Sequence, residues 1–307
     1  MLDTIVTLLG STVRISLPII LCALGAMFCE RAGVLNIGME GIMLLGAFFG
    51  AYGSYISGNA YVGLFFALAT GSLLGLLHGV LTVKFHTNHI INGVAINLLG
   101  DGLSILLLVI IWGNKGKSTE VVGFRTLDSI IKKDIPVFST IFGNLNFLFL
   151  LMLVLVIISY FFIFKTPLGL RLRVIGDKPQ VADTMGINVE RAQIIYVVIG
   201  SAIASIAGAS LSIGSLHYFS KGMVAGRGYM ALAAMVFGMW HPVFILLSGL
   251  FFGFVQAVQM RLQLFNFPVQ FIEMIPYVVT IAMLVLTSKT NKGPQNAGKP
   301  FQRGIRE

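Results

Sequence analysis

The stretch LNFLFLLMLVLVIISYFFIF, residues Leu145–Phe164, carries no charged side chain. The hydrocarbon core of a bilayer is about 30 Å thick, and about 20 mostly apolar helical residues are needed to cross it. A helix satisfies its own backbone hydrogen bonds, whereas lipid offers no partners for them. The stretch therefore predicts a membrane-spanning helix.

Eight further apolar runs have the same character. They are Thr4–Cys29, Ile37–Ser57, Ala60–Phe85, Ile90–Gly113, Gln193–Gly214, Tyr229–Met239, Val243–Leu262 and Pro268–Ser288. Tyr229–Met239 is too short to cross the bilayer alone, so it must borrow residues from the preceding loop or be re-entrant. We therefore expect an all-α fold, a polytopic transmembrane helical bundle of about nine spans with broken helices.

The composition of the whole chain indicates the same class. Of its 307 residues, 56% are hydrophobic and 11% are charged, and the mean hydropathy is +0.90. A soluble domain carries about a quarter charged residues, so a soluble fold is excluded. The net charge is +9, but the basic residues lie between the apolar runs and in the tail. Such residues are orientation signals, and we expect no nucleic-acid binding.

Two basic segments predict the orientation of the bundle. They are the loop Lys165–Arg191 and the residues after Ser288. Basic loops stay in the cytoplasm, so both segments are expected there. Four runs separate them, and parity then places the N-terminus and the loop Asn114–Asn144 outside. The chain divides into a transmembrane domain (1–288), which includes a cytoplasmic loop (165–192), and a basic cytoplasmic tail (289–307).

Small residues and glycine-interrupted segments shape the expected helices. Gly71, Gly75 and Gly79 share one helix face, and such faces let backbones approach closely in lipid. Two segments, Glu30–Gly41 and Lys221–Gly228, break the apolar pattern. Comparable breaks in the two halves of a transporter indicate broken helices beside a central site. The two segments share little sequence, so an internal repeat stays an open question.

Polar side chains inside the runs are candidates for a solute pathway, because charge in hydrocarbon faces a cavity or a partner. Asn97 and Asp101 lie four residues apart, on one face of the fourth run. The other pathway candidates from these runs are Asn36, Glu40 and Asn92. The alternative for Asp101 is a structural ion pair with Arg14, and both interpretations stay open here.

Two local motifs suggest chemistry that the rest of the sequence does not support. Gly116-Lys117-Ser118 resembles the end of a nucleotide-binding loop, but the motif needs a glycine where Ile111 stands. His86 and His89 lie three residues apart, with no third metal ligand apparent in the sequence. No nucleophile–base spacing appears either. We expect no ATP site, no metal, no cofactor and no enzymatic activity.

The loop Lys165–Arg191 contains the end signals of a short helix, Lys178–Met185. Asp177 is its expected N-cap, Pro179 lies in its first turn, and Gly186 is its expected C-cap. A short capped helix between spans suits docking into a groove on another protein. The residues assigned to that contact are Arg173, Asp177, Lys178, Pro179, Met185 and Gly186.

Three stretches carry a resemblance to a known family. They are Glu30–Gly50 (ERAGVLNIGMEGIMLLGAFFG), Thr166–Val189 (TPLGLRLRVIGDKPQVADTMGINV) and Ala225–Pro242 (AGRGYMALAAMVFGMWHP). Together with nearly the whole chain up to the tail, they resemble the permease subunits of bacterial ABC importers for branched-chain amino acids, simple sugars and nucleosides. Within that family the chain is most similar to the shorter of the two permeases in nucleoside importers of the basic-membrane-protein type.

The resemblance implies a location and partners. In that family the loop corresponding to Thr166–Val189 is the coupling element that docks on the ABC ATPase subunit. A second, different permease subunit completes the pathway, and two ATP-binding domains supply the energy. An extracellular solute-binding lipoprotein delivers the small-molecule substrate. The chain is thus expected in the lipid membrane of a bacterial cell, as a multi-pass plasma-membrane protein.

Nucleosides are the expected substrates, because Phe219 and Tyr218 beside the second broken segment can stack on a base. Simple sugars and riboflavin-like solutes are the alternatives. A stand-alone secondary transporter, with Asp101 and Glu40 as its ion site, is a rival of a different class. Neighbouring genes for an ATPase and a second permease would favour the importer, and an isolated gene would favour the rival.

Overall fold

The computed structural model describes residues 2–126, 145–263, 269–287 and 293–301, and every regular element that they form is a helix. In chain order these are α1 (Leu2–Arg31), α2 (Met39–Ser57), α3 (Ala60–Gly79) with the π-helical turn η1 (Val80–Lys84), α4 (His89–Trp112), α6 (Phe147–Lys165), α7 (Pro167–Asp177), α8 (Pro179–Thr184), α9 (Val189–Leu211) with η3 (Ser212–Leu216), α10 (Arg227–Phe237), α11 (Pro242–Leu262) and α12 (Val269–Thr287). The all-α prediction is confirmed.

The number of spans stays approximate. In the described part of the chain, six helices are long and apolar enough to cross a bilayer, and they lie in α1, α3–η1, α4, α6, α9–η3 and α11. The remaining predicted runs form α2, α10 and α12. α10 has 11 residues, which extend only about 16 Å at 1.5 Å per residue. The prediction that this run is too short to cross alone is therefore confirmed.

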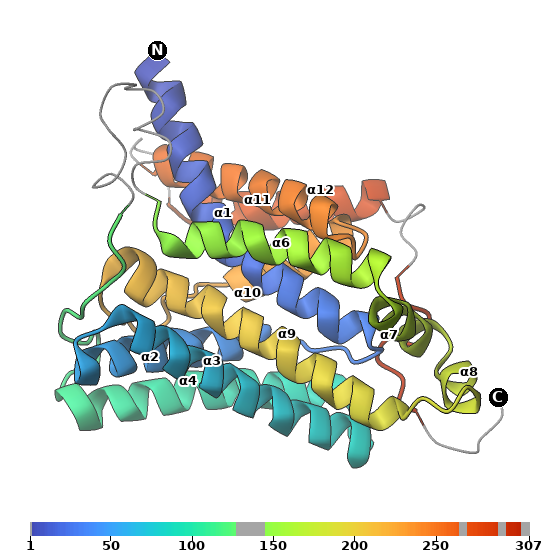
Figure 1. Ribbon diagram of the computed structural model, residues 1–307. Helices are drawn as coiled ribbons and strands as arrows, with labels where there is room; N and C mark the ends of the chain where they lie inside the picture. The colour runs from blue at the N-terminus through green and yellow to red at the C-terminus, as the bar shows by residue number, and fades with distance from the viewer. Residues whose placement is uncertain (1, 127–144, 264–268, 288–292, 302–307) are drawn as a thin grey trace.

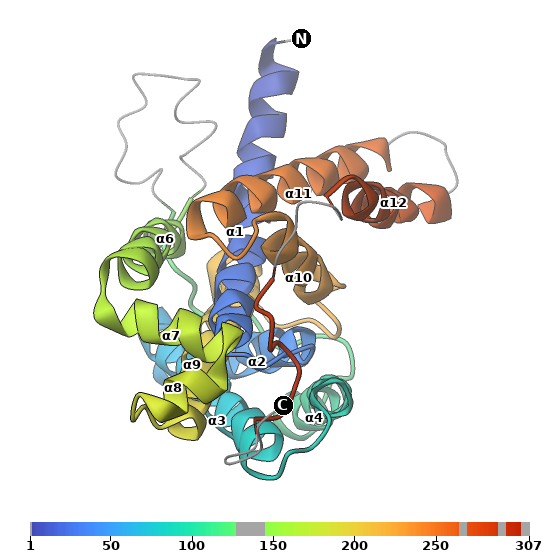
Figure 2. The same cartoon turned by 90° about the vertical axis from the view of Figure 1, so that its right-hand side faces the viewer.

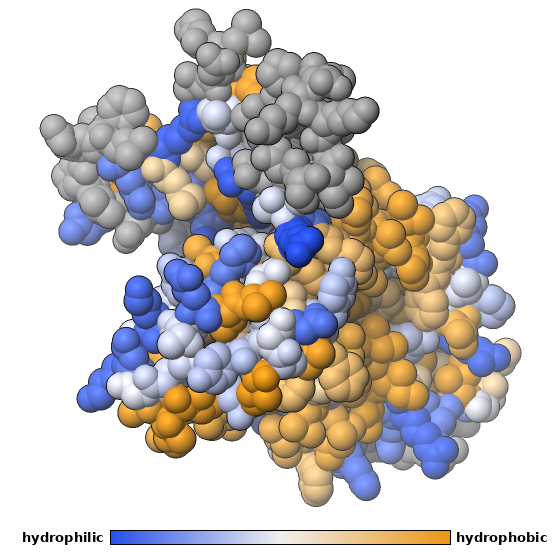
Figure 3. Space-filling model, turned by 60° about the vertical axis from the view of Figure 1, so that its left-hand side comes forward, coloured by the Kyte–Doolittle hydropathy of each residue, from blue (hydrophilic) through white to orange (hydrophobic). Residues whose placement is uncertain are grey.

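The centre of the bundle is formed by α1, α2 and α9. α9 packs on α1, α2 and α3, while α11 packs on the opposite side of α1 (Figures 1 and 2). Large apolar side chains stay exposed on the outer helices, among them Phe65, Leu98, Ile157 and Leu247. Figure 3 shows that such residues form a broad hydrophobic surface on one face. This surface matches a chain whose solvent is lipid.

Close approach of small residues holds α2, α3 and α9 together. A Cβ atom on Gly208 of α9 would lie 1.8 Å from the carbonyl oxygen of Met43 in α2. A Cβ atom on Gly71 of α3 would lie 2.3 Å from Cβ of Ser205, and one on Gly46 would lie 2.3 Å from Oγ of the same serine. The expected small-residue packing faces are therefore present.

The first and last described segments of the chain, the start of α1 and residues 293–301, lie at opposite ends of the bundle. The N-terminus begins α1 at one end, while α7, α8 and the C-terminal residues lie together at the other (Figure 1). The predicted placement of these two ends on opposite sides of the membrane stays a prediction.

Candidate functional site

Within the first broken segment, Glu30–Gly41, residues 32–38 join α1 to α2, and backbone hydrogen bonds to the end of α1 reach only as far as Val34, whose N–H donates to the carbonyl of Cys29 at 3.0 Å. Side chains of other helices also bind the backbone of this segment. Gln193 of α9 donates to the carbonyl of Ala32 at 2.9 Å, and His89 Nδ1 accepts the N–H of Leu35 at 3.2 Å. His78 Nε2 lies 3.2 Å from the carbonyl of Leu35. Irregular backbone within a membrane is tolerated where protein satisfies it in this way.

Asn97 of α4 continues this support at the start of α2. Its Oδ1 accepts the N–H of Gly41 at 2.7 Å, and its Nδ2 donates to the carbonyl of Ile37 at 3.1 Å. The same amide donates to the hydroxyl of Tyr229 in α10 at 3.0 Å. One side chain therefore connects α4, the first broken segment and α10.

Asn36 is enclosed within the first broken segment and is only 1% exposed. Its Oδ1 accepts the N–H of Gly38 at 3.0 Å, and its Nδ2 donates to Oγ of Ser201 at 3.4 Å. These contacts hold the segment against α9. The side chain thus shapes the site by fixing the backbone around it.

Glu40, in the first turn of α2, binds the second broken segment directly. Its Oε1 accepts the N–H of Gly226 at 2.8 Å, and its Oε2 accepts the N–H of Gly228 at 2.7 Å. Gly226 and Gly228 begin α10, where the helix dipole favours a negative charge. A Cβ atom on Gly228 would lie 2.7 Å from Cα of Glu40. The carboxylate therefore joins the two broken segments that the sequence singled out.

Glu40 and Gly226 belong to two of the stretches that resemble the permease family, Glu30–Gly50 and Ala225–Pro242. These two stretches make a second contact at the other end of α10. Trp240 Nε1 donates to Oε2 of Glu30 at 2.7 Å, and Arg31 donates to the carbonyl of Trp240 at 2.9 Å. Met239 and Trp240 have φ values of 50° and 52°, which non-glycine residues seldom adopt. Two of the three stretches that carry the family resemblance are thus bound to each other at both ends of α10.

Asp101 stands apart from this network. It lies within electrostatic range of Glu40 and Tyr229, but its side chain is exposed. Arg14 and Asp101, both described, form no ion pair, and the guanidinium of Arg14 lies 3.5 Å from Oγ of Ser11. The structural alternative, in which Arg14 and Asp101 lock α1 to α4, is therefore wrong for this conformation.

Two other predicted pathway residues lie outside the network. Asn92 donates a hydrogen bond to Oγ1 of Thr87 in the turn before α4. Phe219 has no exposed surface, and its ring packs edge-on against Phe48 with centroids 5.2 Å apart. It cannot stack on a solute here, because it is fully buried in the core. Tyr218, its neighbour, is partly exposed.

Sequence analysis missed a cavity beside the second broken segment. It has a volume of about 360 Å³ and lies between α10, α11 and α12. Gln256 and Gln259 of α11 and Tyr277 of α12 contribute its polar side chains. The available signal was the pair of glutamines three residues apart inside the mostly apolar run Val243–Leu262, which places both on one helix face.

The two motifs that sequence analysis rejected as nucleotide and metal sites include residues with structural contacts. Ser118 N–H donates to the carbonyl of Phe219 at 2.9 Å, and Lys221 N–H donates to the carbonyl of Gly116 at 2.9 Å. The Gly116-Lys117-Ser118 stretch is therefore paired with the second broken segment and does not form a phosphate cradle. Among the described residues no cluster of potential ligands could hold a metal, and His89 supports Leu35.

The loop between α6 and α9 forms two helices, α7 and α8. Asp177 is the last residue of α7, and α8 begins after Lys178 without a side-chain cap. The prediction that Asp177 caps the short helix is therefore wrong. The stronger start signal is Thr166-Pro167, where Oγ1 of Thr166 accepts the N–H of Gly169 at 3.1 Å. The resulting helix α7 runs on through Asp177.

The other features expected of the short helix are present. Pro179 lies in its first turn and is buried. Gly186 follows it with a φ of 79°, the left-handed conformation typical of a residue after a helix C-terminus. Met185 is 77% exposed at the tip, and Lys178 is also exposed. Arg173, on α7, lies over the ring of Phe164 at 5.4 Å and is partly covered by it.

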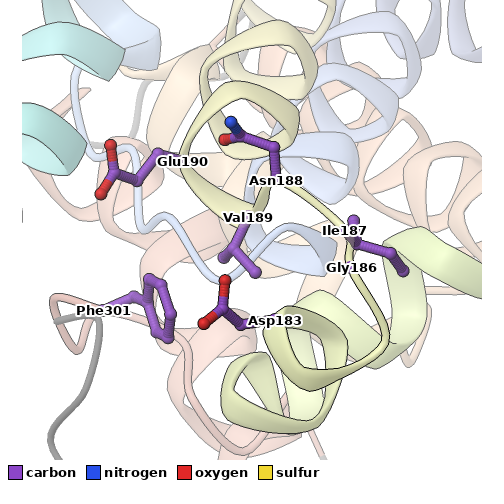
Figure 4. Close-up of a pocket in the computed structure, with 7 residues that line it drawn as sticks. All are labelled: Asp183, Gly186, Ile187, Asn188, Val189, Glu190 and Phe301. Atoms are coloured by element: carbon purple, nitrogen blue, oxygen red, sulfur yellow. The ribbon is translucent and has the colours of Figure 1, made fainter.

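The C-terminal segment 293–301 is bound to this loop. Asn296 N–H donates to the carbonyl of Gly176 at 3.0 Å, and Gly298 N–H donates to the carbonyl of Gly33 at 3.0 Å. Phe301 is 7% exposed and packs with Ile175, Ala182 and Val189. It borders a pocket of about 210 Å³ at the junction of α8 and α9 (Figure 4). The segment thus connects the first broken segment to α7 and α8.

The comparisons with known proteins agree with this arrangement. Residues 8–287 match the family described as "Branched-chain amino acid transport system / permease component". The guanosine ABC transporter permease protein NupQ of Bacillus subtilis is 35% identical, over 96% of both chains. The nucleoside ABC transporter permease protein NupC of Lactococcus lactis is 33% identical, over 92% of this chain and 93% of that one. The putative glucose ABC transporter permease protein TsgC13 of Haloferax volcanii is 33% identical, over 83% of this chain and 78% of that one.

Both the family match and these relatives extend over most of the chain. Permeases of this kind are transport components of membranes and not enzymes. This multi-pass membrane protein therefore belongs to the family of permease components of branched-chain amino acid transport systems.

Proposed function

We propose that this chain is one of two permeases in an ATP-driven importer that takes up nucleosides across a bacterial plasma membrane. The observation that carries the proposal is the similarity to permeases named for guanosine and for nucleosides, which extends over 96% and 92% of this chain. At this coverage the broken segments and the cytoplasmic loop are included in the similarity.

The chemistry of the network supports a neutral solute. Both oxygens of Glu40 accept backbone N–H groups, so the carboxylate needs no cationic solute as a partner. We assign Asn36, Asn97 and Glu40 to positioning the pathway backbone, and Asp101 to its polar lining. A nucleoside has hydroxyl and ring donors and acceptors that suit such groups.

The partners follow from the absence of an ATP site in the sequence. We assign α7 and α8, within the loop 165–192, to docking on an ABC ATPase subunit, with Met185 at the centre of the contact. A second permease is supported by two further relatives from the organisms that have NupQ and NupC. NupP of Bacillus subtilis and NupB of Lactococcus lactis are 26% and 24% identical to this chain. An extracellular solute-binding lipoprotein would deliver the solute. The basic residues of the loop 165–192 and of the tail 289–307 favour the cytoplasm for both. The N-terminal end of the bundle then faces outward, toward the lipoprotein.

A simple sugar is the second candidate substrate. The observation that favours it is the relative of Haloferax volcanii, whose name assigns it to glucose and which is 33% identical. Sugars and nucleosides share hydroxyl groups, so the carboxylate and amides of the network suit both.

The proposal can be tested by measuring solute uptake in host cells that lack their own nucleoside and glucose importers. The complete importer is expressed, and the entry of labelled guanosine, adenosine, uridine and glucose is compared with that in cells lacking only this permease. We expect permease-dependent uptake of nucleosides and none of glucose. Permease-dependent uptake of glucose without nucleosides would replace the proposal by the second candidate.

A further inference from the structure

The cavity between α10, α11 and α12 has the features of a binding site. Its volume is about 360 Å³, and it is lined by Ala225, Met230, Gln256, Gln259, Pro276 and Tyr277. None of these lining side chains is charged. The cavity therefore suits a neutral ligand with several hydrogen-bonding groups.

One lining side chain lacks a partner. Gln256 is 7% exposed, and its Oε1 has no hydrogen-bond partner among the described residues. Buried polar atoms in proteins nearly always find a partner, so an orphan beside a cavity calls for an explanation. The Oε1 atom itself has almost no exposed surface, so a rotation of the carboxamide is needed before a solute in the cavity can supply the missing partner.

The second broken segment forms one wall of the cavity. Ala225 and Gly226 have φ values of 49° and 79°, so the backbone turns sharply just before α10. A Cβ atom on Gly226 would lie 3.0 Å from the hydroxyl oxygen of Tyr277. The N–H of the same Gly226 is held by Glu40 at 2.8 Å. An occupant of the cavity thus lies beside Gly226, whose hydrogen bond to Glu40 connects the two broken segments.

The side chains match the chemistry of a nucleobase. The carboxamides of Gln256 and Gln259 each offer an adjacent donor and acceptor, the pattern with which glutamine binds base edges. Tyr277 offers an aromatic face of the kind on which bases stack, together with a hydroxyl. Met230 and Pro276 add apolar surface for the rest of a planar ring.

We propose that this cavity is a solute-binding site of the permease, in which Gln256 and Gln259 bind the edge of a nucleobase beside the ring of Tyr277. The inference rests on the proposed function, because it names where the nucleoside binds on its way through the chain. It assigns to the permease itself a contact with the base, in addition to any made by the solute-binding lipoprotein.

The test uses the complete importer in proteoliposomes, supplied with saturating nucleoside and solute-binding protein. Gln256→Leu removes the orphan amide at similar size, and Gln259→Leu removes its neighbour. Gln263→Leu, at an exposed position just after α11, is the matched control. We expect the Gln256 variant to lower nucleoside uptake by about tenfold, to change the ratio of guanosine to uridine uptake, and to retain ATP hydrolysis stimulated by the loaded binding protein. The control should match the wild type.

The outcomes separate this inference from the proposed function. Wild-type uptake of nucleosides with unchanged rate and base preference in the Gln256 and Gln259 variants would overturn the inference and leave the function standing. A wild-type importer that carries no nucleoside would overturn both. Should Gln256→Leu fail to assemble, Gln256→Asn and Gln256→Glu keep a polar group at the site. Their base preference must then differ from that of the wild type, and an unchanged preference would also overturn the inference.

Discussion

At the scale of single residues, the carboxylates of Glu40, in the first turn of α2, and of Asp101, in α4, have opposite surroundings. Glu40 accepts two backbone hydrogen bonds, at 2.8 and 2.7 Å, from the start of α10. Asp101 is exposed, and no hydrogen bond of its carboxylate is recorded among the described residues. The pair therefore offers a direct comparison between a carboxylate that holds backbone in place and one that does not.

Glu40→Ala should destabilise the chain, because it leaves the N–H groups of Gly226 and Gly228 without their acceptor. Hydrogen bonds to a charged group contribute about 1.5–3 kcal/mol each, so we expect a loss of at least about 1.5 kcal/mol in the free energy of unfolding. Unfolding of the purified chain in mixed detergent and SDS measures it. Asp101→Asn is the control and should leave stability unchanged, and equal losses in the two variants would contradict this account of Glu40.

The sequence predicted part of this network for a physical reason. Polar side chains are costly inside apolar runs, so Asn36, Glu40 and Asn97 stood out, and the structure places all three around the broken segments. Phe219 was wrongly assigned to stacking on a solute, because an aromatic residue near a break suits a core as well as a ligand. Gln256 was missed, since its orphan oxygen becomes visible only when its neighbours are known.

At the scale of elements, close packing of α2 on α9 depends on glycine. Gly208→Val should destabilise the bundle, because any Cβ would lie 1.8 Å from the carbonyl oxygen of Met43. Overpacking costs about 1–3 kcal/mol, measured by the same unfolding assay. Gly102→Ala in α4 is the control, since no atom lies within 4 Å of its added Cβ. It should be neutral or stabilising by up to about 1 kcal/mol, and a Gly208 variant of wild-type stability would refute the packing argument.

The tip of α8 carries an apolar side chain where a solvated loop needs none. Met185 is 77% exposed, and we expect Met185→Ser to weaken the contact with the ATPase. In the assembled importer, ATP hydrolysis should continue while nucleoside uptake falls by about tenfold, as for a central interface residue. Thr184→Ser, at the neighbouring exposed position, serves as the control. A Met185 variant with fully coupled transport would exclude this side chain from the docking surface.

The segment 293–301 should stabilise α8. Phe301→Ala removes the ring that packs on Ile175, Ala182 and Val189, so local opening of α8 should become more frequent. Hydrogen exchange of the amides in α8 should then speed up by about tenfold, while exchange in α2 stays the same. Lys299→Ala, at an exposed position of the same segment, should have no effect. Unchanged exchange in the Phe301 variant would show that the segment does not support α8.

Element boundaries could be predicted only where one signal dominated. Gly186 was correctly placed after α8, because its left-handed conformation is one that glycine adopts easily. Asp177 was misassigned, because Thr166-Pro167 starts a helix that continues through it. The docking of residues 293–301 had no local signal at all, since it depends on carbonyl groups of Gly33 and Gly176, far away in sequence.

At the scale of the whole molecule, the orientation of the bundle can be tested by labelling. The native thiols Cys22 and Cys29 are fully buried, so background reaction should be low. A membrane-impermeant thiol reagent applied to intact cells should modify Lys115→Cys, in the exposed loop after α4, and spare Lys299→Cys until the cells are opened. The opposite pattern would invert the proposed topology.

At this scale the sequence predicted the fold class and the family. It did not predict which segments meet around the proposed solute pathway. Composition alone excluded a soluble protein, and three sequence stretches indicated the permease family. Two of those stretches meet in space, through Glu40 with Gly226 and through Arg31 with Trp240. Their sequences give no sign of this pairing, because the contacts use backbone groups of residues 186 and 209 positions apart.

The central claim is that this chain moves nucleosides only when an ATPase drives it. Proteoliposomes containing this permease, its partner permease, the ATPase and the solute-binding protein should accumulate labelled guanosine against a gradient when ATP is supplied on the ATPase side. Accumulation should stop without ATP or with a hydrolysis-deficient ATPase. Guanosine accumulation by this chain alone, driven by a proton or sodium gradient without ATP, would contradict the account.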